Sequence, residues 1–128
     1  MSRALDDLDP RFLPLAAMLL ARTVEANIPV MIINTRRTAE EQAVHVANGT
    51  SWVKHSKHQD GLAIDICPWL IFKEYGDSKL NWVASDPIWT KLGAIGERLG
   101  LRWGGRWRDT PDLGHFEYMA RPVEVAPV

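Results

Sequence analysis

The segment "SKHQDGLAIDICP" (56–68) decides the interpretation of this chain, because it places a carboxylate inside an apolar run. Asp65 lies between two isoleucines, and His58 precedes it on the other side of a glycine. A buried charge without a partner costs free energy. Alternate residues of a strand face opposite sides. A strand over 62–66 would turn its leucine and isoleucines to the core and turn Ala63 and Asp65 to the open face, where the glycine lets His58 join them.

A second segment of chemical interest is "PDLGHFEYM" (111–119). If residues 115–119 are extended, His115 and Glu117 share one face of the strand. Asp112 precedes His115 by three residues, and a glycine between them allows a bend. The segment therefore offers one imidazole and two carboxylates close together.

Two histidines and one carboxylate are a usual donor set for catalytic zinc, which keeps one coordination position open for water. His58, Asp65 and His115 can form such a set. The metal lowers the pKa of the water, and Asp112 is a candidate to accept its proton. A second interpretation stays open at this point: the two histidines are ordinary surface or core residues, and Asp65 caps a turn.

The rest of the chain predicts a mixture of helices and strands without regular alternation, which favours an α+β fold over a doubly wound sheet. "TAEE" has the capping-box pattern, with Thr38 as N-cap and Glu41 at the third helical position. Asp86 is the expected N-cap of a later helix, with Pro87 at its first position. The helices are expected over about 14–27, 39–48 and 87–99, and the strands over 29–34, 62–66, 101–103 and 115–119.

The length of 128 residues, with 46% hydrophobic and 24% charged residues, suits one domain with one core. The formal net charge of −1 gives no general attraction to nucleic acid or to an anionic membrane. The apolar stretch 12–26 is too short to span a bilayer, and the amino terminus lacks a secretory signal pattern. The one cysteine, Cys67, excludes an internal disulfide, and we expect it to be buried and unreactive.

Other histidines and tryptophans have simpler structural interpretations. His45 and His55 are expected at the surface, and Trp89 lies at helical spacing in the expected core. Trp103 and Trp107 flank two glycines just before the second segment. They either line a groove for substrate or pack in the core.

These motifs resemble a known family, the zinc metallopeptidases that include phage L-alanyl-D-glutamate endolysins and the D-alanyl-D-alanine carboxypeptidases of vancomycin resistance. The family pattern is Ser-x-His, a glycine, Ala-x-Asp, and later an acidic residue three before a histidine. "RTAEEQ" (37–42) and "LGLRWGGRW" (99–107) resemble the family's arginine segment and its approach to the last ligand. In this chain the pattern is formed by Ser56, His58, Gly61, Ala63, Asp65, Asp112 and His115.

The resemblance covers about residues 29–118. It implies a hedgehog-like α+β fold, in which a small antiparallel sheet carries the metal site and packs with about three helices. It also implies one zinc ion per chain, with Asp112 as general base and Arg37 holding the substrate or polarising its carbonyl. Many members have glutamate in place of Asp112, whereas the endolysin-like branch has aspartate there. The zinc ligands implied by the resemblance are His58, Asp65 and His115. Glu117 is either a rival to Asp112 as the base or a residue that supports His115. Ser56 and Trp107 are expected to contact the substrate.

The function implied by the resemblance is hydrolysis of the stem peptide of bacterial peptidoglycan, at the bond between L-alanine and D-glutamate. We expect one catalytic domain over 1–128, without a wall-binding domain, acting as a monomer without membrane insertion or nucleic acid. The protein would be made in the cytoplasm without a signal peptide and reach the cell wall through a separate membrane pore. Two alternatives remain: a D-alanyl-D-alanine carboxypeptidase or dipeptidase, and a zinc-bearing binding module without catalysis.

Overall fold

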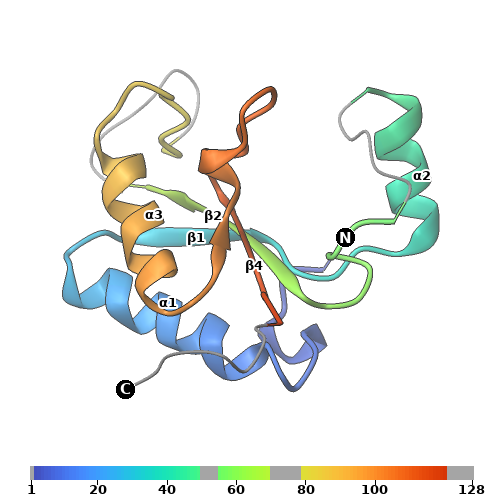
Figure 1. Ribbon diagram of the computed structural model, residues 1–128, viewed down its shortest axis with the longest axis horizontal. Helices are drawn as coiled ribbons and strands as arrows, with labels where there is room; N and C mark the ends of the chain where they lie inside the picture. Colours follow the sequence, from blue (N-terminus) through green and yellow to red (C-terminus); the bar gives the residue numbers. More distant parts are fainter. Residues whose placement is uncertain (1, 50–54, 70–78, 121–128) are drawn as a thin grey trace.

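The computed structural model describes residues 2–49, 55–69 and 79–120, and it has the predicted α+β architecture (Figure 1). Within these residues, one antiparallel sheet has the strand order β1-β2-β4-β3. The helices are α1 (Leu13–Glu25), α2 (Ala39–Ala47) and α3 (Ile88–Arg98), and the strands are β1 (Val30–Asn34), β2 (Ala63–Pro68), β3 (Arg102–Trp103) and β4 (His115–Glu117). Short 3-10 helices span Leu5–Asp7 and Gly104–Arg106.

Local sequence signals explain where the helices begin and end. The capping box of α2 is complete, because the Thr38 side chain accepts from the Glu41 backbone N–H and the Glu41 side chain accepts from the Thr38 N–H. Helix α3 starts one residue later than expected, since Pro87 is the residue before it. Asp86 still performs a capping function, because its Oδ1 accepts from the Ile88 N–H at 2.9 Å.

The core lies where α1 and α3 meet the sheet, whereas α2 stands apart at the opposite end of the molecule (Figure 1). The isoleucines of β2 point into this core as predicted, and Asp65 points away from it with part of its side chain exposed. Ala63 pairs with Glu117 as Asp65 pairs with His115, and it is fully buried although it lies outside the core cluster. Side chains without measurable exposure include Phe12, Ala16, Leu19, Ile64, Ile66, Leu92 and Phe116.

Trp89 and Cys67 also lie in the core, as the sequence predicts. Burial raises the pKa of the Cys67 thiol to about 12. Because the thiolate is the nucleophilic form, Cys67 is a structural residue.

Helix α3 approaches the sheet closely through two glycines. A Cβ atom on Gly93 would lie 2.3 Å from the Trp103 ring, and a Cβ on Gly96 would lie 2.4 Å from the Phe116 ring. Both distances are far shorter than van der Waals contact. The glycines therefore allow the helix backbone to rest directly on β3 and β4.

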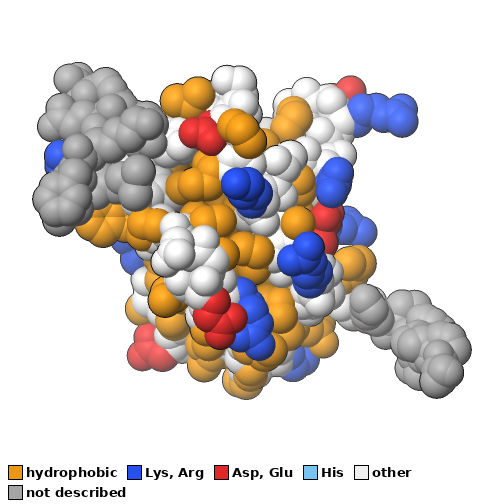
Figure 2. Space-filling view, turned by 90° about the vertical axis from the view of Figure 1, so that its left-hand side faces the viewer, with side chains coloured by type: hydrophobic (Ala, Val, Ile, Leu, Met, Phe, Trp, Pro, Cys, Tyr) orange, Lys and Arg blue, Asp and Glu red, His pale blue; other side chains and the backbone are white. Residues whose placement is uncertain are grey.

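The surface carries charges of both signs. Figure 2 shows the face on the left of Figure 1, where basic and acidic side chains are interspersed with hydrophobic ones. This mixture agrees with the formal net charge of −1. No helix in the described part of the chain has the length and apolar character needed to cross a membrane.

The close approach of α3 predicts the effect of Gly96→Ala. Alanine is favoured over glycine within a helix by about 1 kcal/mol, but its methyl group has no room beside Phe116. We expect a net loss of about 1–3 kcal/mol in the free energy of unfolding, as overpacking usually causes, measured by urea denaturation. Lys91→Ala, at an exposed position of the same helix, is the control and should change stability by less than about 0.5 kcal/mol. Unchanged stability of Gly96→Ala would contradict the close packing.

Candidate metal centre

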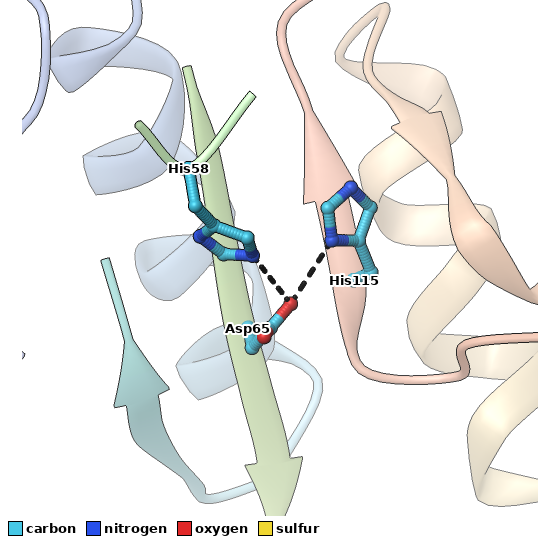
Figure 3. Close-up of side chains that lie close together, drawn as sticks. All are labelled: His58, Asp65 and His115. Atoms are coloured by element: carbon cyan, nitrogen blue, oxygen red, sulfur yellow. Dashed lines mark hydrogen bonds and ion pairs between the residues drawn. The ribbon is translucent and has the colours of Figure 1, made fainter. Parts of the chain in front are cut away.

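Three side chains from distant parts of the chain converge on the open face of the sheet (Figure 3). His58 comes from the turn before β2, Asp65 from β2 itself, and His115 from the start of β4. Asp65 and His115 are direct partners in the register of β2 and β4. One ligand atom from each residue lies within 4.8 Å of the other two. The structure thus brings together the three residues predicted from sequence.

The spacing of these atoms suits a tetrahedral ion. The Oδ1 atom of Asp65 lies 3.2 Å from His58 Nε2 and 3.1 Å from His115 Nδ1. Ligand atoms around a tetrahedral zinc with bonds of about 2.0 Å are separated by about 3.3 Å. Only small side-chain adjustments are therefore needed to bind the metal.

The contacts of His58 leave one nitrogen available for a metal. Its Nδ1 lies 2.6 Å from the Thr35 carbonyl oxygen, to which it donates. Its Nε2 is buried and has no hydrogen-bond partner among the described residues, although Asp65 Oδ1 is within ion-pair distance. A neutral imidazole with its proton on Nδ1 has its lone pair on Nε2. That lone pair is directed toward Asp65, where the metal would bind.

His115 is oriented through the opposite ring nitrogen from His58. Its Nε2 lies 2.8 Å from Glu117 Oε1, while its Nδ1 faces Asp65. Glu117 is itself close to two cations, with Lys57 Nζ at 3.5 Å and an Arg102 nitrogen at 3.9 Å. A carboxylate on the far nitrogen of a ligating histidine is the usual arrangement that orients such a ligand. This geometry favours a supporting role for Glu117 over the role of base.

Electrostatics of the cluster favour a cation. Burial alone would raise the pKa of Asp65, but the hydrogen bond from His115 and the nearby imidazole of His58 hold it well below its usual range. Burial alone would lower the pKa of His115, but its hydrogen bonds to Asp65 and Glu117 raise it to about 9. The site thus attracts positive charge, and a metal ion would displace the proton of His115 on binding.

Asp112 lies at the rim of the cluster. Its side chain is half exposed, and its Oδ2 is 4.0 Å from His115 Nδ1. The pKa of Asp112 is raised, first by partial burial and then by the nearby charge of Asp65. A half-exposed carboxyl group with a raised pKa beside the cluster is a candidate to accept and return a proton.

The two tryptophans before β4 have different environments. Trp107 is partly exposed, and its ring lies 5.0 Å from the ring of His115. Trp103 is buried, and its Nε1 donates to the Leu113 carbonyl at 2.7 Å. Trp103 therefore belongs to the core, whereas Trp107 forms part of the wall beside the cluster.

Arg37 and Ser56 are buried next to the ligand loop. The Arg37 backbone N–H donates to the His58 carbonyl, and its guanidinium donates to Gln42 Oε1 at 2.6 Å. Arg37 is 8% exposed, and its Nε has no hydrogen-bond partner within the described part of the chain. Ser56 Oγ accepts from the His58 N–H at 3.1 Å, so it holds the loop. A substrate contact of either side chain stays a prediction.

The remaining histidines lie outside the cluster. His55 is exposed as expected and pairs with Asp60. His45, which was expected at the surface, lies on α2 and is partly exposed. Burial lowers the pKa of His45.

Several residues that contact the cluster were not identified from the sequence. Asn34 Nδ2 donates to Asp65 Oδ2 at 2.8 Å, and the carbonyl of Thr35 accepts from His58. Gln42 and Lys57 support Arg37 and Glu117 respectively. The one available signal was the change from apolar to polar residues at 34–35, where the strand "PVMIIN" ends.

Comparison with known proteins identifies related peptidases. A family model described as D-alanyl-D-alanine carboxypeptidase matches residues 48–118, which include the three ligand candidates and Asp112. The L-alanyl-D-glutamate peptidase of Escherichia phage T5 is 33% identical over 105 residues, covering 67% of this chain and 72% of that protein. The L-alanyl-D-glutamate peptidase of Listeria phage A118 is 35% identical over 106 residues, covering 80% of this chain and 35% of that protein. The chain therefore spans about a third of the phage A118 protein.

Two solved structures share the fold. The L-Ala D-Glu endopeptidase ChiX of Serratia marcescens superposes with a TM-score of 0.72 at 19% identity, over 90% of this chain and 83% of that chain. A mutant of the vancomycin resistance D,D-pentapeptidase VanY, solved in complex with Zn(II), superposes with a TM-score of 0.58 at 20% identity, over 87% of this chain and 72% of that chain. The predicted peptidase-like α+β architecture is thus confirmed.

The geometry predicts that each ligand candidate is needed for metal binding. We expect His58→Ala, Asp65→Ala and His115→Ala to lose zinc from the purified protein, since each removes one of three converging donors. Zinc content is measured by atomic absorption after dialysis. The control is His55→Ala, which removes an exposed histidine three residues from His58 and should leave zinc content unchanged. Full zinc content in all three alanine variants would show that the metal is held elsewhere.

Proposed function

This chain belongs to the zinc peptidase family described as D-alanyl-D-alanine carboxypeptidase, and on that premise we propose that it hydrolyses the stem peptide of bacterial peptidoglycan between L-alanine and D-glutamate. The observation that carries the proposal is the His58–Asp65–His115 cluster with the half-exposed Asp112 at its rim. The choice of bond follows the names of the phage relatives, both of which are L-alanyl-D-glutamate peptidases.

We propose that one zinc ion per chain is held by His58 Nε2, Asp65 Oδ1 and His115 Nδ1. When bound, zinc would polarise the scissile carbonyl and activate a water molecule as the nucleophile. The protein's own contribution is a fixed set of donors. Thr35 and Glu117 hold the two imidazoles in orientations that direct His58 Nε2 and His115 Nδ1 at the position of the metal.

Asp112 is proposed to move the proton. It would accept a proton from the attacking water and return it to the leaving amine. Its position near His115 and its raised pKa suit both steps. Glu117 is the weaker candidate, because its carboxylate is buried and already engaged by His115 and Lys57.

Arg37 and Trp107 are proposed to bind substrate. Stem peptides carry carboxylates, and a guanidinium can hold a carboxylate through two parallel hydrogen bonds. Gln42 holds one side of the Arg37 guanidinium and leaves Nε without a partner among the described residues. Trp107 offers a flat, partly exposed ring next to His115, against which a peptide can pack. Ser56 is proposed to act mainly through the loop that carries His58.

A second candidate function is the removal of D-alanine from the end of the stem peptide, because the matching family model is described as a D-alanyl-D-alanine carboxypeptidase. The same metal chemistry serves both reactions. A zinc-bearing module without catalysis is less well supported, since a half-exposed carboxylate, Asp112, lies beside the metal ligands where a base is needed.

The protein is proposed to act on the cell wall as a monomer. One chain supplies all three ligand candidates and the candidate base, so no second copy is needed to complete the site. The route from the cytoplasm to the wall, through a separate membrane pore, remains part of this proposal.

Digestion of purified peptidoglycan tests the choice of bond. We expect the zinc-loaded protein to release fragments whose new amino terminus is D-glutamate, identified by mass spectrometry after amino-terminal labelling. The metal-ligand variant His58→Ala is the control and should release none. Release of free D-alanine without new D-glutamate termini would establish the carboxypeptidase alternative, and no release of either would contradict both.

Two isosteric substitutions separate the candidate bases. Asp112→Asn should keep zinc bound and lower turnover by roughly a hundredfold to ten-thousandfold, the usual contribution of general acid–base catalysis. Glu117→Gln should weaken zinc binding by roughly 10- to 100-fold, because the carboxylate that orients His115 is lost. Zinc affinity and wall hydrolysis are measured for both variants. A nearly fully active Asp112→Asn together with an inactive, zinc-loaded Glu117→Gln would make Glu117 the base.

A further inference from the structure

The pairing of β1 with β2 contains an irregularity beside the metal centre. The register runs through Met31↔Cys67 and Ile32↔Ile66, and then Asn34, not Ile33, lies opposite Asp65. One residue of β1 is therefore bulged out of the ladder. Such bulges re-aim the side chains that follow them and are frequent next to active sites.

The bulge decides which face of the sheet Asn34 occupies. Directly opposed residues of an antiparallel pair point to the same face. In an unbroken register, Ile33 would lie opposite Asp65, and Asn34 would lie opposite Ile64 and face the core. With the bulge, Asn34 shares the face of Asp65 and reaches the metal centre.

The contacts made there are specific. Asn34 Nδ2 donates to Asp65 Oδ2 at 2.8 Å, which leaves Oδ1 directed at His58 and His115. The next residue, Thr35, accepts from His58 Nδ1 through its carbonyl oxygen. The end of β1 thus holds two of the three ligand candidates, although it supplies none.

Asn34 is a polar residue at a buried position, where an apolar side chain would be expected to stabilise the fold more. It is 5% exposed, and its Oδ1 is buried without a hydrogen-bond partner among the described residues. A flipped amide would place this oxygen against the Asp65 carboxylate, so the orientation is determined by the pairing. A buried acceptor without a partner is destabilising, and such violations are expected at functional sites.

We propose that Asn34 is a positioning residue of the metal centre, which holds Asp65 through Oδ2 so that Oδ1 is presented to the metal between His58 and His115. This inference rests on the proposed zinc site but not on which peptide bond is cleaved. Its alternative is a purely structural role, in which the amide only satisfies Asp65 within the sheet.

The variant that separates these roles is Asn34→Leu, which keeps the same branched arrangement of heavy atoms but removes both the donor and the unpartnered acceptor. Zinc affinity is measured by competition with a chromophoric chelator. We expect it to fall by roughly 10- to 100-fold, as for other residues that orient metal ligands. The urea midpoint of the metal-free protein should stay close to that of the parent or rise, because removal of the unpartnered Oδ1 offsets the loss of the hydrogen bond to Asp65. The visible spectrum of the cobalt-loaded variant should shift, because Asp65 is no longer held.

A matched control exists elsewhere in the fold. Asn81 is also buried and donates from Nδ2 to an aspartate, Asp86, at 2.9 Å. Unlike Asn34, it satisfies its Oδ1, which accepts from the Val83 N–H. Asn81→Leu should therefore lower the urea midpoint and leave the zinc affinity of the folded protein unchanged. Asn34→Ala provides a second variant at the test position if leucine does not fit.

The outcomes are distinguishable. Weaker zinc binding at an unchanged or higher midpoint, with a shifted cobalt spectrum, supports a positioning role for Asn34. Parental zinc affinity in Asn34→Leu and Asn34→Ala overturns it, and so does a loss of affinity that merely accompanies a drop in midpoint like that of Asn81→Leu. If the parent protein itself binds no zinc, the proposed zinc site fails as well, and the parent measurement shows this before any variant is compared.

Discussion

Asp65 carries a negative charge on β2, an inner strand of the sheet, and its carboxylate must be matched by its neighbours because little of it reaches water. The two strands beside β2 provide much of this match. β1 contributes the amide of Asn34, and β4 contributes the imidazole of His115. The turn that leads into β2 contributes His58. The order β1-β2-β4 is therefore what assembles the centre, and each partner of Asp65 depends on it.

The two faces of β2 have different roles: one packs in the core, and the other carries the metal centre. One face is apolar and is covered by helices, with α3 resting so closely on β3 and β4 that glycine is needed at the contacts with Trp103 and Phe116. This packing fixes β4 and hence His115, its first residue. The other face carries Asp65, whose side chain is partly exposed, and the half-exposed Asp112 lies at the rim of the cluster. A rigid core on one side thus supports a precise donor set on the other.

Charge is distributed so that the centre is completed by a cation. Within the cluster, Asp65 binds two imidazoles, and the pKa of His115 is raised to about 9, so a proton occupies a place where a divalent ion would bind. Glu117 adds a further negative charge behind His115, where Lys57 and Arg102 partly balance it. The same zinc peptidase fold recurs in proteins only 19% and 20% identical to this chain.

Local patterns in the sequence predict the helices and strands to within a few residues, because capping residues, prolines and glycines act locally, as Thr38 and Glu41 show for α2. It also indicated the ligand candidates, since a carboxylate within an apolar strand requires partners. The contacts that hold the ligand candidates in place depend on the tertiary structure. Asn34 reaches Asp65 because of a bulge between β1 and β2, and the histidine nitrogens are selected by Thr35 and Glu117. Strand register and the direction of a side chain depend on contacts between segments far apart in the chain, and no local pattern encodes them.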